Sequence, residues 1–179
     1  YEYALVKVKA EISTYSLLYA AHHLEAIQQK GTMLLLVENS INEALPEKIA
    51  RWISDVEGDG WNVVTEVIDP TLAVTEVKAK IVAQDAINAD LKSVFILGHV
   101  PVPYSGYIVP DGHTNNHYGA WPADIYYAEL NESWTDVANF PTTSQPTRTQ
   151  NIAGDGKFDQ SNIVDAELAL GRVDFFNMP

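Results

Sequence analysis

The chain has 179 residues, 46% of them apolar and none of them cysteine, and its 24 acidic and 11 basic residues give a formal net charge of −13. This length and apolar content can build one core without disulfides or metals, so a folded domain is expected. The negative charge would repel phosphate backbones and anionic lipid headgroups, and no apolar run approaches the roughly 20 residues that cross a bilayer. We therefore expect neither nucleic acid as a partner nor membrane insertion.

The first segments alternate between strand-like and helix-like patterns. Residues 3–10 alternate apolar and polar side chains, which is typical of a strand. Residues 13–31 carry apolar positions three and four apart between Ser13 as N-cap and Gly31 as stop, which predicts a helix. Residues 32–40 open with a continuous apolar run, typical of a strand that is buried on both faces of a parallel sheet.

Two helix and strand pairs follow. Helices are predicted from about Leu45 to Glu57 and from about Leu72 to Asn88, and strands over 61–68 and 93–100. Strands and helices that alternate with short connections predict right-handed crossovers. We expect a doubly wound α/β core over residues 1–99, with a mostly parallel sheet and helices on both faces.

The pattern changes after Gly98. Residues 100–162 are rich in proline and polar side chains and predict a long, irregular, acidic loop region. Strands are predicted over 124–130 and 166–175, the second within a final segment 163–179. The chain stops directly after that strand, so we expect a single α/β domain, or a subdomain cut from a larger protein.

Three histidines suggest one kind of metal site. His99 lies at the carboxyl end of a predicted buried strand, and ligands of open α/β sheets bind beyond the carboxyl ends of the strands. His113 and His117 follow in the next loop, so the three imidazoles could meet around zinc, as in a zinc-dependent hydrolase. The alternative is a set of hydrogen-bonded loop histidines without metal.

The acidic residues suggest another kind of site. Segment 111–167 holds nine carboxylates and only two cations, Arg148 and Lys157. Calcium binds six to eight oxygens, many of them carboxylates, so it could neutralise this excess. The alternative is a Gly-Asp turn with solvated acids.

Residues 151–162 can be compared with an EF-hand loop. With Gly156 in the sixth position, Asn151, Asp155 and Asp159 take ligand positions one, five and nine. Ala153 and Asn162 occupy positions three and twelve, so the loop is not an EF-hand. We expect it to supply some ligands to a calcium site that distant acids complete, with Asp124 and Asp136 as candidates.

Four motifs occur in a recognisable order. They are Gly98-His99-Val100-Pro101 at a strand end, Asp124-Ile125-Tyr126-Tyr127, the loop from Gly154 to Asp159, and Gly171-Arg172 at a strand end. Over roughly residues 32–175 the chain resembles the amino-terminal part of the catalytic region of gingipain-type cysteine peptidases and their bacterial relatives. His99 departs from the pattern, because the family usually has Asp there.

The resemblance implies a caspase-like fold, calcium bound by the acidic loops, and secretion or a cell-surface location in a Gram-negative bacterium. In the family, a His in a Gly-His-Gly turn and a Cys at a later strand end perform catalysis, and both lie downstream of the Gly-Arg strand. The implied function is a non-catalytic first subdomain whose partners are the downstream catalytic subdomain and a peptide or protein substrate. The alternative is an inactive surface module that binds or supports other molecules. Arg172 could be a buried partner of a strand-end carboxylate or a recognition group, and we expect the structural role.

Overall fold

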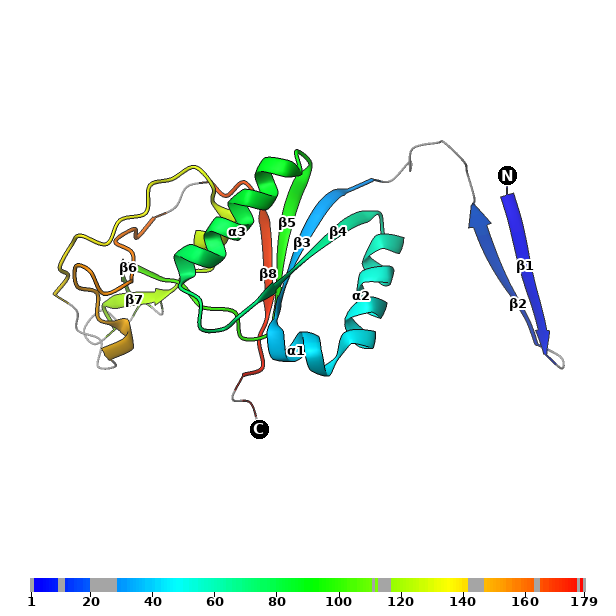
Figure 1. The fold of residues 1–179 in the computed structure, drawn as a ribbon, viewed down its shortest axis with the longest axis horizontal. Coiled ribbons are helices and arrows are strands. Elements are labelled where there is room, and N and C mark those ends of the chain that lie inside the picture. The colour runs from blue at the N-terminus through cyan, green and yellow to red at the C-terminus, as the bar shows by residue number, and fades with distance from the viewer. Residues whose placement is uncertain are drawn as a thin grey trace.

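The computed structural model describes residues 2–9, 12–19, 29–110, 112, 117–141, 147–162, 165–176 and 178. Its centre is a four-stranded sheet in which every neighbouring pair is parallel, with the order β4-β3-β5-β8 (Figure 1). The strands are β3 (Gly31–Glu38), β4 (Trp61–Ile68), β5 (Leu91–Leu97) and β8 (Ala169–Val173). The predicted α/β class with a parallel sheet is confirmed.

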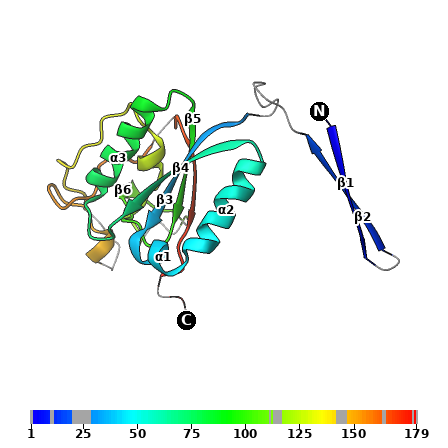
Figure 2. The same cartoon turned by 45° about the vertical axis from the view of Figure 1, so that its right-hand side comes forward.

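Helices cover both faces of this sheet (Figures 1 and 2). Helix α3 (Val74–Ile87) packs on one face, where Val77 and Ile81 join Leu34 and Leu36 of β3 in the larger core. Helix α2 (Pro46–Gly58) follows the short helix α1 (Asn39–Ala44), and its Ile49 packs with Leu35 and Val37 on the opposite face. Successive residues of β3 therefore bury to opposite sides, which is why its sequence is continuously apolar.

The first two strands form a hairpin of their own. β1 (Glu2–Lys9) and β2 (Ile12–Tyr19) are antiparallel and pair only with each other (Figure 1). The helix predicted over 13–31 is therefore wrong up to Tyr19, and residues 20–28 lie outside the described part. Ile12, Thr14, Tyr15 and Tyr19 are β-branched or aromatic, and these residue types favour a strand when a neighbouring strand supplies backbone partners.

The segment between β5 and β8 contains short elements. β6 (Tyr104–Ile108) pairs antiparallel with β7 (Gly119–Pro122), and a helical turn α4 (Ile125–Ala128) and a 3₁₀ turn η1 (Thr147–Thr149) follow. The strand predicted over 124–130 is wrong, because Tyr126 and Tyr127 are both buried in the larger core and a strand would point them to opposite faces. The strand predicted over 166–175 is present as β8.

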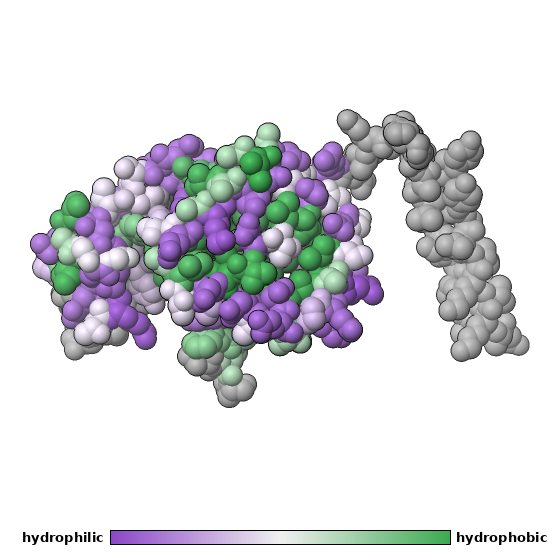
Figure 3. Space-filling model, viewed as in Figure 1, coloured by the Kyte–Doolittle hydropathy of each residue, from purple (hydrophilic) through white to green (hydrophobic). Residues whose placement is uncertain are grey.

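Two surface properties bear on function. None of the described helices is long and apolar enough to cross a membrane. Apolar surface gathers over β4 between α2 and α3 (Figure 3), where the edge strand exposes Val67.

Candidate functional site

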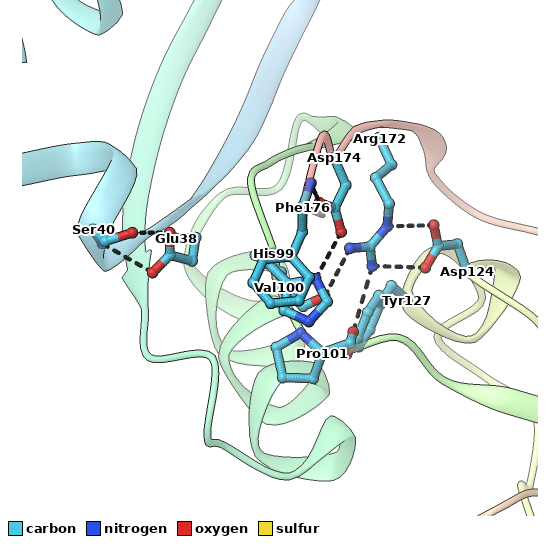
Figure 4. Close-up of polar contacts among 10 residues, drawn as sticks. All are labelled: Glu38, Ser40, His99, Val100, Pro101, Asp124, Tyr127, Arg172, Asp174 and Phe176. Carbon is cyan, nitrogen blue, oxygen red and sulfur yellow. Dashed lines mark hydrogen bonds and ion pairs between the residues drawn. The ribbon is translucent and has the colours of Figure 1, made fainter. Parts of the chain in front are cut away.

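The guanidinium of Arg172 joins three segments at the carboxyl ends of the strands (Figure 4). Its Nε and Nη2 donate to the two carboxylate oxygens of Asp124 at 2.7 and 2.8 Å, and its Nη1 donates to the carbonyl of Val100 at 2.7 Å. A longer bond of 3.4 Å runs from Nη2 to the carbonyl of Pro101. Only the planar guanidinium can make this bidentate pair and still reach the carbonyls. Arg172 thus ties the turn after β5 and the start of α4 to β8.

Tyr127 strengthens the same junction. Its hydroxyl donates to the carbonyl of Pro101 at 2.7 Å, and its ring is fully buried. Burial raises the pKa of Tyr127 far above its ordinary value, and the positive charge of Arg172 offsets only part of that increase. The phenol therefore stays protonated at physiological pH and acts as a hydrogen-bond donor.

His99 and Asp174 form the second pair at this edge. The Nδ1 of His99 lies 2.9 Å from Oδ2 of Asp174, and the imidazole stacks on the ring of Phe176 with centroids 3.9 Å apart (Figure 4). Burial acts to raise the pKa of Asp174, but hydrogen bonds from the Phe176 amide and from His99 hold it below its ordinary value. The ionised carboxylate favours the proton on Nδ1 and orients the imidazole.

Glu38 ends β3 and caps α1. Its carboxylate accepts from the amide of Ser40 at 2.9 Å, the hydroxyl of Ser40 at 2.6 Å and the amide of Ile41 at 3.3 Å. The serine hydroxyl is therefore engaged with Glu38. The turn after β5 passes close by, because Gly98 has a φ of +89° and a Cβ there would lie 2.8 Å from Cβ of Glu38. Only glycine allows this approach without strain.

A hollow of about 570 Å³ opens beside these groups, between α1 and α2 on one side and β5 and β8 on the other. Its lining is mainly apolar and includes Leu45, Trp52, Phe95, Leu97 and Val173. His99 and Asp174 also line it. A concave apolar surface with few polar groups at strand ends is typical of a binding site.

The predicted calcium ligands Asp136 and Asp159 bind backbone amides. The two oxygens of Asp136 accept from the amides of Gly154 and Gly156, each at 2.7 Å. The carboxylate of Asp159 accepts from the amides of Val137 and Ala138 and from the hydroxyl of Thr135. Oriented backbone N–H groups can neutralise a carboxylate in the way a cation does.

The predicted ligands Asp155, Asn151 and Asp124 have other partners. Asp155 accepts from the amides of Ile152 and Lys157 and from the ammonium group of Lys157. Asn151 is fully buried and donates to two backbone carbonyls, while its Oδ1 has no partner among the residues that the structure describes. Asp124 binds Arg172 instead of the loop. Within the described ranges, no group of three or more His, Cys, Asp or Glu residues is placed to hold a metal, and calcium binding stays a prediction.

The histidines predicted as zinc ligands have separate surroundings. His99 binds Asp174, whereas the carbonyl of His117 accepts from the indole nitrogen of Trp121 at 3.1 Å. His113 lies outside the described residues.

Two acids with defined partners, Asp174 after β8 and Glu129 after α4, were not predicted as site residues from the sequence. Asp174 directly follows β8, so the strand-end rule that identified His99 would also have found it. Glu129 is fully buried and accepts from the amides of Asn131 and Glu132 and from the indole of Trp134. No sequence pattern distinguishes this buried carboxylate from its exposed neighbours.

Comparisons of the chain with protein-family models, with curated proteins and with solved structures found no match.

Proposed function

We propose that this chain is the non-catalytic first subdomain of a secreted, gingipain-like cysteine peptidase. In this proposal the catalytic His and Cys lie downstream of Pro179. The subdomain supports the catalytic subdomain and forms one wall of the substrate cleft.

The observation that carries the proposal is the contact among the four sequence motifs. Arg172 binds the turn that ends in Pro101 and also binds Asp124, and Tyr127 binds the same turn. The Gly154 to Asp159 loop joins them through Phe158, whose ring stacks on Tyr126 with centroids 4.3 Å apart. Motifs whose contacting residues are up to 72 positions apart in sequence thus form one connected unit, as parts of a single inherited architecture would.

The chemistry of the strand ends supports a non-catalytic role. A cysteine peptidase needs a thiolate beside a base, and the chain has no cysteine. Arg172 and Asp124 saturate each other, and the imidazole of His99 is bonded to Asp174 and stacked on Phe176. These groups stabilise the edge of the sheet.

The test is the longer polypeptide. The gene beyond Pro179 should encode a Gly-His-Gly turn and a strand-end Cys, and the longer protein should cleave peptide substrates in a thiol-dependent manner. Substitution of that Cys by Ala should abolish cleavage, and residues 1–179 alone should show none. Thiol-independent cleavage by residues 1–179 would refute the proposal.

A second candidate is an inactive surface module of the same fold, which the apolar hollow beside His99 favours. It predicts a longer sequence that lacks the His and the Cys but retains the residues lining the hollow.

A further inference from the structure

One face of the sheet is incompletely covered. Among the described residues, the core on the α3 side contains fourteen buried hydrophobic side chains, whereas the core on the α2 side contains three, Leu35, Val37 and Ile49. On the α2 side, Phe95 and Leu97 of β5 remain partly open, and so does Val173 of β8. A parallel sheet is normally buried on both faces, so this surface is suited to a further layer.

The strand order explains why the chain leaves this face open. The connections from β4 to β5 and from β5 to β8 both move in the same direction along the sheet order β4-β3-β5-β8. Crossovers of one hand then place both connections on the same face, the face of α3. The connection from β3 to β4 moves in the opposite direction along the sheet. It therefore places α1 and α2 on the other face, over β3 and β4. Among the described residues, no connection between these four strands covers β5 and β8 on the α2 side.

The shape of the open surface suits a helix beside α2. Phe95 is the register partner of Gly171 on β8, and a Cβ on Gly171 would lie 3.3 Å from the Phe95 ring, so this ring covers Gly171 on the floor of the groove. Leu45 and Trp52 form one wall, and Phe175 and Phe176 close the carboxyl end. A helix can insert an apolar stripe into such a groove through side chains three and four residues apart.

Charge defines the chemistry of the partner. The charged lining of the groove consists of Lys48 and two carboxylates that already have partners: Glu38 is buried and caps α1, and Asp174 binds His99. The charge that acts on a partner is therefore mainly the −13 of the whole chain. A second copy of the chain would bring the same negative charge and be repelled. A helix whose apolar stripe is flanked by Lys or Arg is attracted to this surface.

We infer that the hollow between α2 and β8 is a docking groove for an amphipathic helix with basic flanks from the downstream subdomain. The source of the helix rests on the proposed function. Phe175 and Phe176 directly follow β8 and line the groove, so the described chain after β8 runs along its carboxyl end.

A synthetic peptide tests the groove on residues 1–179. The probe has about 18 residues, with leucine on one helical face and lysine on the other, and its control carries glutamate in place of lysine. Calorimetry should show binding of the lysine peptide and none of the glutamate peptide. Leu45→Lys places a charge in the groove and should weaken binding roughly tenfold or more.

Val82→Lys is the matched control, because Val82 is 44% exposed on α3 and Leu45 is 47% exposed in the groove. It should leave binding unchanged, and circular dichroism should show both variants folded. Equal weakening by the two variants would indicate nonspecific attraction to an acidic protein and overturn the inference, as would no binding at all.

The source is tested in the longer polypeptide by hydrogen exchange. Amides of α2 and β8 should exchange more slowly in it than in residues 1–179, while amides of α3 should not change. Unchanged exchange in α2 and β8 would overturn the assignment of the helix to the downstream subdomain. Thiol-dependent cleavage is measured separately, so a failure of the peptidase proposal leaves the peptide result intact.

Discussion

Replacing Arg172 by alanine should destabilise the fold strongly. The substitution leaves the carboxylate of Asp124 without its bidentate partner and the carbonyl of Val100 without its donor. The two side chains are 14% and 24% exposed, so solvent reaches only part of the uncompensated charge. Removing one partner of a fully buried ion pair costs about 3–5 kcal/mol, and the residual exposure lowers our expectation here to about 2–4 kcal/mol.

Urea unfolding followed by tryptophan fluorescence measures this loss of free energy, and thermal unfolding measures the matching fall in Tm. For a protein of this size, 1 kcal/mol corresponds to about 2–4 °C in Tm, so the Tm should fall by roughly 4–16 °C. Arg172→Lys should recover only part of the stability, because an ammonium group cannot reproduce the planar, forked contact.

Arg51 provides the matched control. It pairs with Asp55 one turn later on α2, but the two side chains are 76% and 59% exposed. Arg51→Ala should therefore cost no more than about 0.5 kcal/mol. A value for Arg172→Ala within about 0.5 kcal/mol of wild type would refute the argument that this pair holds three segments together.

Three further predictions concern the strand ends and the acidic loop. Gly98→Ala should lower the free energy of unfolding, measured in urea, by about 2–4 kcal/mol, because at a φ of +89° the new Cβ would clash with Glu38. Gly154 has a similar φ of +82° but open space around it, so Gly154→Ala should cost about 1 kcal/mol. Equal costs for the two variants would contradict the close approach of Gly98 to Glu38. Burial acts to raise the pKa of Asp155, but hydrogen bonds from Lys157 and the Ile152 amide hold it below its ordinary value, so its stabilisation is present above about pH 4 and is lost as the pH falls further. The Tm of the wild type should therefore drop more steeply between about pH 5 and pH 3 than that of Asp155→Asn, and parallel curves would exclude this contribution. If the loop binds calcium, as its composition predicts, EDTA should lower the Tm and added calcium should restore it, whereas an unchanged melting curve would count against the site.

Local pattern was sufficient for the elements of the sheet. The strand predicted over 61–68 coincides with β4, and the helix predicted from Leu72 to Asn88 contains α3. The 61–68 segment is rich in β-branched residues, and Val74, Val77 and Ile81 recur three and four residues apart in the α3 segment, so this information lies within each segment. The predictions were wrong at β2 and at α4. β2 pairs with β1, and Tyr126 and Tyr127 of α4 are buried together in the larger core, so long-range partners decide the element at both places.

The acidic loop shows a different limit of sequence reasoning. Counting side chains predicted an unbalanced negative charge and therefore calcium. Backbone amides do not enter such a count, yet those of Gly154 and Gly156 both bind Asp136 in the folded loop. Their orientation depends on the conformation of the loop.

By itself, the sequence determined that this chain forms an α/β fold with a buried parallel sheet, because apolar periodicity is a local property of each segment. The tertiary structure decided which polar groups meet at the strand ends. Asp174 reaches His99, 75 residues earlier in the chain, because parallel pairing brings the ends of β5 and β8 together. Arg172 reaches Asp124, 48 residues earlier, because α4 packs beside β8. It also decided which half of the sheet stays open, since that depends on strand order and crossover hand, which no single segment encodes.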